Sequence, residues 1–217
     1  MPGKLYYFDL GGRAEGIRAM LGHANFEYED VRLTPEQFAE KKQAGFFPLG
    51  SMPVWEEDGE VYCQSSAIIR FLGVRCNYYS ADPMTIWQID SVVDFMEDNT
   101  NGFAAFFGPV FAGQALTESA GHTWLSDYWD KVLPVIEGRL AGHGQKFIAG
   151  TSTPTVADFK AFQPILSSLH NPSCAAPKPT LDLLRQKIDG YPSYKRWVST
   201  MCEELQAYMA AKPARPF

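Results

Sequence analysis

The chain has 217 residues, of which 46% are hydrophobic, and a formal net charge of -6 at pH 7. That length can bury a sizeable core in one domain or two, and the acidic balance argues against nucleic acid or an anionic membrane as a partner. No apolar run approaches the roughly 20 residues that span a bilayer, and the N-terminus lacks the apolar core of a signal peptide. We therefore expect a cytoplasmic protein.

Strand and helix patterns alternate through the first 75 residues. The expected elements are a strand at 4–8, a helix at 13–23, a strand at 26–31, a helix at 35–44, strands at 54–57 and 60–63, and a helix at 65–74. This order predicts a four-stranded sheet. Its first two strands are parallel through a right-handed crossover, and its last two form an antiparallel hairpin.

The stretch from Met52 to Ile68 says most about function. It predicts an edge strand entered through Pro53, a tight hairpin at Asp58-Gly59, a second strand and a helix capped by serine. The residue before a proline is biased toward extended backbone, so Met52 can offer its N–H and C=O to a peptide, across an expected cis Met52–Pro53 bond. A helix start favours a carboxylate. These features indicate a small acidic peptide as the ligand.

Beyond Cys76 the strand signals stop. The expected helices are 84–107, 124–140, one that begins at the Thr155–Asp158 capping box and runs to 169, 181–188 and 194–209, with a loop at 108–119. We predict a first domain at 1–75, a polar linker at 76–83 and an all-helical domain at 84–217.

Cysteine and histidine spacing bears on redox and metal chemistry. Cys63, Cys76, Cys174 and Cys202 form no C-x-x-C pair, which in a cytoplasmic chain favours free thiols. The four histidines never cluster with cysteine or acid at ligand spacing, so no metal is expected.

Several motifs, in one order and at fixed spacings, together resemble the cytosolic glutathione transferases. They are Leu5-Tyr6-Tyr7-Phe8, Gly12-Arg13-Ala14-Glu15-Gly16-Ile17-Arg18, Gly50-Ser51-Met52-Pro53-Val54, Gln64-Ser65-Ser66-Ala67-Ile68, Ile89-Asp90, Thr155 to Asp158 and Tyr191-Pro192. The chain is most similar to the sigma class and its alpha, mu and pi relatives, over nearly its whole length. The resemblance implies a thioredoxin-like α/β N-terminal domain, an all-α C-terminal domain and a homodimer.

The resemblance also implies which residues bind glutathione, the substrate. They are Tyr7, Arg13, Phe38, Lys42, Gly50, Ser51, Met52, Pro53, Gln64 and Ser65, together with Asp90, which reaches the α-amino group of the glutathione in the other subunit. Two positions depart from the family, which often has tryptophan at Phe38 and a longer donor such as glutamine at Ser51. Both departures are expected to weaken the affinity for glutathione.

Three of these residues also have a purely structural interpretation. Asp90 fits an ordinary helix salt bridge, Lys42 a solvated lysine, and Ser65 a helix cap.

Tyr7 is the expected catalytic residue, with Arg13 beside it. A thiol near its usual pKa of about 8.5 is mostly protonated at neutral pH, and a phenolic O–H placed on the sulfur favours the thiolate. Strand alternation puts Tyr6 and Phe8 on one face and Tyr7 on the other, so only one tyrosine faces the site, and the resemblance selects Tyr7. Arg13 stands at a helix start, where a cation opposes the dipole, and it supports the thiolate or binds a carboxylate.

The second substrate is expected to be a hydrophobic electrophile. The expected pocket residues are Phe8, Gly12, Met96, Asn99, Phe103 and Phe106, although aromatic and methionine stripes on helices are more often core.

By this resemblance, the protein joins the glutathione thiolate to that electrophile. One alternative is a glutathione-dependent prostaglandin D isomerase of the sigma class, and another is a crystallin-like structural protein with weak activity. A glutaredoxin- or omega-type redox enzyme needs a cysteine where the first strand meets the first helix, and Leu10-Gly11-Gly12 has none.

Overall fold

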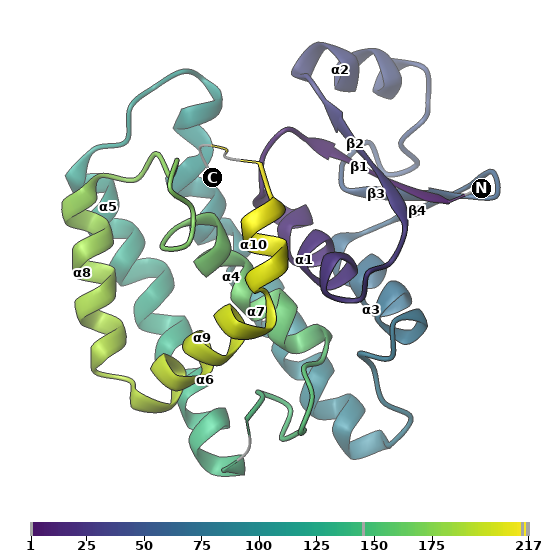
Figure 1. Ribbon diagram of the computed structural model, residues 1–217. Helices are drawn as coiled ribbons and strands as arrows, with labels where there is room; N and C mark the ends of the chain where they lie inside the picture. Colours follow the sequence, from purple (N-terminus) through teal and green to yellow (C-terminus); the bar gives the residue numbers. More distant parts are fainter. Residues whose placement is uncertain (1, 145, 214, 216–217) are drawn as a thin grey trace.

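The computed structural model describes residues 2–144, 146–213 and 215. Its N-terminal part is a mixed sheet with accompanying helices, and the rest of the described chain is helical (Figure 1). The N-terminal elements are β1 (Gly3–Phe8), η1 (Gly12–Ala14), α1 (Glu15–His23), β2 (Tyr28–Leu33), α2 (Pro35–Gln43), β3 (Val54–Glu57), β4 (Glu60–Cys63) and α3 (Ser65–Arg75).

The strands follow the order β2-β1-β3-β4 across the sheet. β1 is parallel to β2, and β3 is antiparallel to both β1 and β4, so the two predicted strand pairs are confirmed. The prediction that Pro53 leads into an edge strand is wrong, because β1 pairs along the other side of β3, with Tyr6 opposite Val54. Pro53 lies just before the ladder, so its missing N–H removes no sheet hydrogen bond.

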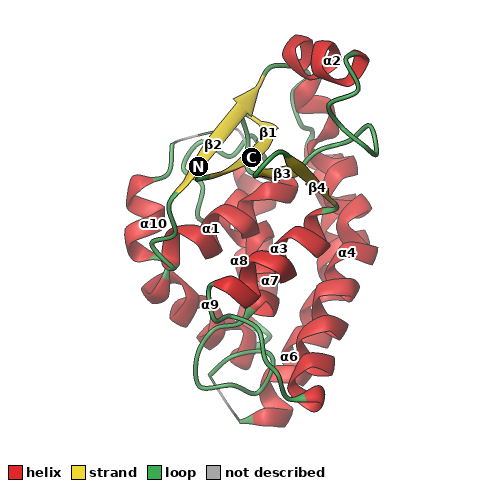
Figure 2. Ribbon diagram, turned by 90° about the vertical axis from the view of Figure 1, so that its right-hand side faces the viewer, coloured by secondary structure: helices red, strands yellow, loops and turns green. Residues whose placement is uncertain are grey.

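The adjacent tyrosines of β1 point to opposite faces of the sheet, as predicted from the two-residue period of a strand. Tyr7 belongs to the large core that the sheet shares with α1, α3 and the C-terminal helices. Tyr6 lies in a smaller cluster with Leu33, Phe47 and Val54, against which Phe38 of α2 packs. Figure 2 shows α2 standing apart from the other helices, across the sheet.

The C-terminal part is a bundle of helices. They are α4 (Pro83–Phe111), α5 (Glu118–Trp124), the π-helical segment η2 (Leu125–Trp129), α6 (Asp130–His143), α7 (Val156–Ser167), α8 (Lys178–Asp189), α9 (Pro192–Glu204) and α10 (Gln206–Ala211). α7 is buried along its whole length and contacts both α1 and α4. Its predicted start is confirmed: Asp158 is fully buried and accepts hydrogen bonds from the backbone N–H groups of Thr155 and Ile148.

Several predicted helix boundaries differ from the structure, and the largest differences are in α4, α5 and the last helix. α4 continues through Pro109 to Phe111, where a loop was expected, because a proline so near the C-terminus removes only one helical N–H bond. The helix expected to begin at residue 124 begins at Glu118 with α5. The Thr117 side chain caps it by accepting a hydrogen bond from the backbone N–H of Ala120. The expected helix at 194–209 is divided at Leu205 into α9 and α10.

One hydrophobic core joins the sheet to the helical bundle. The division at 1–75, 76–83 and 84–217 therefore stays a prediction, and residues 1, 145, 214, 216 and 217 lie outside the described ones. Over the described ranges, the search for a helix with the length and apolarity needed to cross a membrane finds none.

Candidate active site

The Tyr7 hydroxyl lies at the end of β1, where the chain turns into η1. It accepts a hydrogen bond from the backbone N–H of Arg13 at 3.2 Å. Burial raises the pKa of Tyr7 above its usual value, and the nearby cations Arg13 and Arg18 only partly oppose this. Tyr7 is therefore a neutral phenol at physiological pH and keeps a proton to donate.

The turn beside this hydroxyl requires glycine at position 12. Gly12 has φ of +44°, in the left-handed region. A Cβ there would lie 2.7 Å from both the Tyr7 hydroxyl and the Leu10 side chain. The absent side chain leaves the hydroxyl open.

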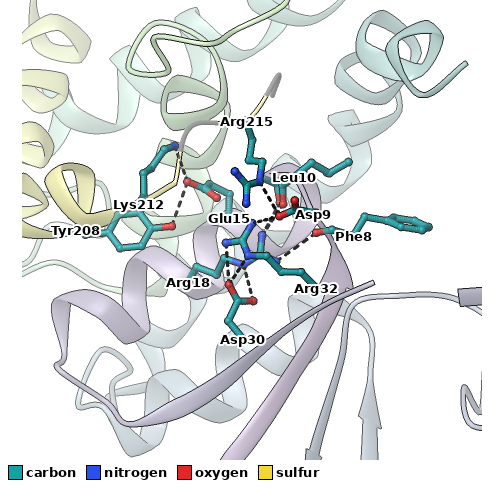
Figure 3. A network of polar contacts seen from close by, with 11 residues as sticks. Phe8, Asp9, Leu10, Glu15, Arg18, Asp30, Arg32, Tyr208, Lys212 and Arg215 are labelled. Carbon is teal, nitrogen blue, oxygen red and sulfur yellow. Dashed lines mark hydrogen bonds and ion pairs between the residues drawn. The ribbon is translucent and has the colours of Figure 1, made fainter. Parts of the chain in front are cut away.

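Arg18 of α1 is buried beneath the loop between β1 and η1 and bonds to its backbone. Its buried guanidinium donates to the carbonyl oxygen of Leu10 at 2.6 Å and to the carboxylate of Asp30 at 3.0 Å (Figure 3). Asp30 lies on β2 and also pairs with Arg32. The loop backbone is thus fixed to two elements of the sheet domain.

The C-terminal segment is tied to both sides of the same loop. Arg215 donates to the carboxylate of Asp9 at 2.6 Å, and Lys212 donates to that of Glu15 at 2.8 Å (Figure 3). Asp9 and Glu15 flank Gly12 and Arg13 in the sequence. No sequence pattern pointed to these contacts, because the partners are 206 and 197 residues apart.

A cavity of about 330 Å³ lies at the loop before β3, and we call it the cis-proline cavity. It is lined by Arg13, Ser51, Met52, Pro53, Gln64, Ser65 and Glu97. The structure thus brings together six residues that were predicted to bind glutathione. The Met52–Pro53 peptide bond is cis, as predicted.

The start of α3 forms one wall of this cavity. Gln64 has φ of +72° and occupies the N-cap position, with no hydrogen bond from its side chain to the helix. Ser65 is the first helical residue, so the prediction that serine caps this helix is wrong. The backbone N–H groups of the first turn have no side-chain cap and face a site suited to an anion.

Phe38, Lys42 and Gly50 lie to one side and do not line the cis-proline cavity. The Lys42 ammonium is 5.7 Å from the centre of the Phe38 ring, and its chain passes Gly50. Phe38 packs on Phe8 with ring centroids 5.4 Å apart. These three residues belong to α2 and the loop that follows it.

Glu97 of α4 is the main site residue that sequence reasoning missed. Its carboxylate accepts from the guanidinium of Arg13, from the ammonium of Lys160 at 2.8 Å and from the hydroxyl of Ser66 at 3.1 Å. Although burial opposes this, the two cations lower the pKa of Glu97 to about 2. Glu97 is therefore ionised and links three elements at the cavity wall.

A second cavity of about 100 Å³, here called the Tyr7 cavity, opens beside the Tyr7 hydroxyl. It is lined by Tyr7, Leu10, Gly12, Arg13, Thr100, Phe103, Ala104, Phe107, Gly108, Phe111 and Gln163. Arg13 lines both cavities and stands between them. Of the predicted second-substrate residues, Gly12 and Phe103 are in this cavity.

The other predicted pocket residues lie elsewhere. Met96 is buried in the core, Phe106 stacks on Trp124 with centroids 4.5 Å apart, and Asn99 donates to the backbone carbonyl of Phe95. The stripe of α4 that lines the Tyr7 cavity steps by three or four residues from Thr100 to Phe111, and positions 99 and 106 lie outside it.

Phe8 lines a larger, adjoining cavity of about 600 Å³. Leu10 and Phe111 line both this cavity and the Tyr7 cavity. Arg32 and Arg215 also line the larger cavity.

Asp90 of α4 contacts Arg70 and Tyr79 of its own chain. Its carboxylate accepts from Arg70 Nε at 2.5 Å and from the Tyr79 hydroxyl at 2.7 Å. The side chain is 33% exposed, so part of it remains accessible from outside the chain.

The residues with metal or redox potential lie apart from this site. Across the described ranges, no group of three or more histidine, cysteine or acidic side chains gathers as metal ligands would. Cys63, Cys76, Cys174 and Cys202 are free thiols, and none lines either cavity.

A mixed four-stranded sheet, a cis-proline loop and a helix start beside it form a thioredoxin-like domain, here followed by a helical bundle. The family described as "Glutathione S-transferase, N-terminal domain" matches residues 2–73. "Glutathione S-transferase 1" of Ascaris suum is 31% identical over 221 residues, which cover 99% of this chain and 98% of that protein.

Two further relatives agree with this match. Human "Hematopoietic prostaglandin D synthase" is 28% identical over 198 residues, 90% of this chain and 94% of that protein. The crystal structure of the glutathione S-transferase from Ascaris lumbricoides has a TM-score of 0.77, with 29% identity over all of both chains. The chain belongs to the glutathione S-transferase family. The predicted fold class and the predicted enzyme class, a transferase, are both confirmed.

Proposed function

We propose that this protein joins the thiolate of glutathione to hydrophobic electrophiles. The observation that carries the proposal is the Tyr7 hydroxyl, which is neutral, held by the Arg13 N–H and open to a cavity with aromatic walls. In this reaction the thiol proton passes to solvent and the sulfur attacks the electrophile. A carbon–sulfur bond forms as a leaving group departs with its bonding electrons, or as a double bond opens and the resulting carbanion takes a proton from solvent.

Glutathione would lie along the cis-proline cavity as an extended peptide. The backbone of Met52 pairs with its cysteinyl unit in the manner of strand addition, and the start of α3 at Gln64 and Ser65 holds the γ-glutamyl carboxylate. Lys42, exposed on the far side, takes the glycyl carboxylate. The phenylalanine at position 38 and the short Ser51 lower the affinity, because neither reaches the peptide with a long donor.

The electrophile occupies the Tyr7 cavity next to the sulfur. Its walls are mainly apolar, so burial of apolar surface supplies most of the binding free energy. Arg13 faces both ligands and stabilises the charge on the sulfur.

The working form that we propose is a cytoplasmic homodimer, with Asp90 of each chain reaching the α-amino group of the glutathione in the other. The exposed third of Asp90 leaves room for that contact beside Arg70 and Tyr79.

Binding to immobilised glutathione, followed by turnover with a panel of electrophiles, tests the proposal. The panel includes a prostaglandin endoperoxide, because the 28% identity to a prostaglandin D synthase favours isomerisation as a second candidate activity. Conversion of the endoperoxide without loss of glutathione would support that candidate. Retention on glutathione with negligible turnover of every compound would indicate the crystallin-like alternative, and failure to bind glutathione would contradict all three.

A further inference from the structure

Lys160 is a lysine in the interior of the protein. It lies on α7, its side chain is 3% exposed, and its ammonium donates to Glu97 Oε2 at 2.8 Å. Within the described part of the chain, its ammonium has no other hydrogen-bond partner. Burial lowers the pKa of Lys160, and Glu97 opposes that effect by attracting the charged form. Burying a charged lysine costs desolvation free energy, which one ion pair offsets only in part. A charge kept at such a cost points to a role beyond packing.

Glu97 connects Lys160 to Arg13. One carboxylate oxygen accepts from the Arg13 guanidinium, and the other accepts from Lys160 and Ser66. Arg13 in turn stands between the two cavities, beside the hydroxyl of Tyr7. A chain of charges therefore runs from the core to the place where the sulfur would lie.

The sum of these charges is what matters to a thiolate. Arg13 and Glu97 alone would be a neutral pair, and Glu97 would cancel most of the field of Arg13. With Lys160 the three side chains carry a net charge of +1. A net positive charge stabilises an anion in a partly desolvated site far more than a neutral pair does.

Two other cations that act on this group of side chains, Arg70 and Arg18, have carboxylate partners of their own. Arg70 of α3, whose charge also lowers the pKa of Lys160, pairs with Asp90 and Asp94 of α4. Arg18 of α1 lies 5.8 Å from the centre of the Tyr7 ring and pairs with Asp30. None of these groups bonds to Glu97, whose partners are Arg13, Lys160 and two serines.

We propose that Lys160 is a positioning residue for the thiolate site: through Glu97 it fixes Arg13, and it supplies the net positive charge that holds glutathione as the thiolate. The inference rests on the proposed binding of glutathione beside Tyr7. It assigns a role to a residue that touches neither ligand.

Variants that change the net charge of the three positions test this proposal by the order of their pH midpoints for thiolate formation. The measurement is the pH midpoint of thiolate formation, from the ultraviolet absorbance of bound glutathione and from the pH profile of kcat/KM. Lys160→Met makes the three positions neutral and is expected to raise the midpoint by roughly one pH unit. Glu97→Gln leaves a charge of +2 and is expected to lower it. The double variant Lys160→Met/Glu97→Gln returns to +1 and is expected to restore the wild-type midpoint.

Lys131→Met, an exposed lysine of α6, is the matched control and should leave the midpoint unchanged. If Lys160→Met does not fold, Glu97→Gln and the double variant still decide the question, because they differ by one charge. Lower activity with an unshifted midpoint in these variants would show a merely structural role and overturn the inference. Failure of the wild type to bind glutathione, measured by calorimetry, would instead overturn the proposed function.

Discussion

The backbone N–H of Arg13 donates to the hydroxyl of Tyr7 at 3.2 Å, so the turn after β1 orients the phenol at the end of that strand. The hydroxyl accepts from the chain and keeps its own proton, because burial raises the pKa of Tyr7. A donor fixed in this way needs no reorganisation when a thiolate forms in front of it, which is the arrangement that electrostatic stabilisation requires.

We expect Tyr7→Phe to leave glutathione binding nearly intact and to lower turnover by one to three orders of magnitude, roughly 1.4 to 4 kcal/mol in the barrier. The variant removes one charge-assisted hydrogen bond to sulfur. Steady-state kinetics and a binding titration measure the two effects.

The neighbouring Tyr6 provides the control. Its hydroxyl donates to Glu56 at 2.5 Å on the opposite face of the sheet. Full activity in Tyr7→Phe together with its loss in Tyr6→Phe would show that the assignment is wrong by one residue.

Gly12→Ala is expected to inactivate the protein more than it destabilises it. The new Cβ would lie 2.7 Å from the Tyr7 hydroxyl, in a backbone conformation with φ of +44°. Gly113→Ala is the matched control, because Gly113 has φ of +69° and nothing lies within 4 Å of its added Cβ. Both variants place a Cβ at a positive φ, which is expected to lower the free energy of unfolding by about 1 kcal/mol in each. Urea denaturation measures that loss. Only Gly12→Ala should lose turnover, and equal losses in the two would contradict the steric argument.

Local patterns could be predicted from the sequence, and long-range contacts could not. β3 and β4 have the predicted bounds because the Asp-Gly turn fixes a short hairpin, and Tyr7 was separated from Tyr6 by the period of the strand. Glu97 was missed because no sequence pattern distinguishes it from the other acidic residues on the polar face of a helix. Its partners Arg13 and Lys160 are 84 and 63 residues away.

The second-substrate residues show the same limit. A helical period predicts which positions share a stripe of α4, but not which stripe faces the cavity. Neighbouring elements decide that, and here Phe106 stacks on Trp124 instead. The pocket residue Gln163 comes from α7, which no pattern in α4 can reveal.

Stability at acid pH should depend on Glu97. Its pKa is about 2 in the folded protein against 4.5 normally, so its stabilising contribution is complete above pH 4.5 and is lost as the pH falls toward 2. Glu97→Gln should therefore be less stable than the wild type at pH 7, by up to about 3 kcal/mol before solvent screening. The urea midpoints of the wild type and Glu97→Gln should converge as the pH is lowered from 7 to 2. A difference between them that stays constant would contradict the ion-pair assignment.

Gln163 is expected to set selectivity among electrophiles. Its Oε1 is buried without a hydrogen-bond partner in the described structure, and the side chain lines the Tyr7 cavity among mainly apolar neighbours. Because Oε1 can only accept a hydrogen bond, Gln163→Leu should slow electrophiles that carry a hydroxyl or N–H donor by about tenfold, while alkyl halides are unaffected or faster. A uniform change in kcat/KM across both kinds of compound would show that the amide does not read the substrate.

The last prediction concerns Asp90 and the dimer. If Asp90 serves the neighbouring chain, Asp90→Ala should weaken glutathione binding by roughly 1.5 to 3 kcal/mol, less in proportion to its exposure. Tyr79→Phe is the control, because it removes a hydrogen bond to Asp90 within the chain and keeps the carboxylate. Size in solution is the first measurement, since a strict monomer would rule the mechanism out.

A mixed dimer of one Asp90→Ala chain and one Tyr7→Phe chain then decides where Asp90 acts. Each site would take Tyr7 from one chain and Asp90 from the other. One site of the mixed dimer therefore carries both lesions and the other carries neither, so about half of the wild-type activity should remain with normal affinity. Two impaired sites, one with each lesion, would place Asp90 in the pocket of its own chain, where its bonds to Arg70 and Tyr79 already hold it.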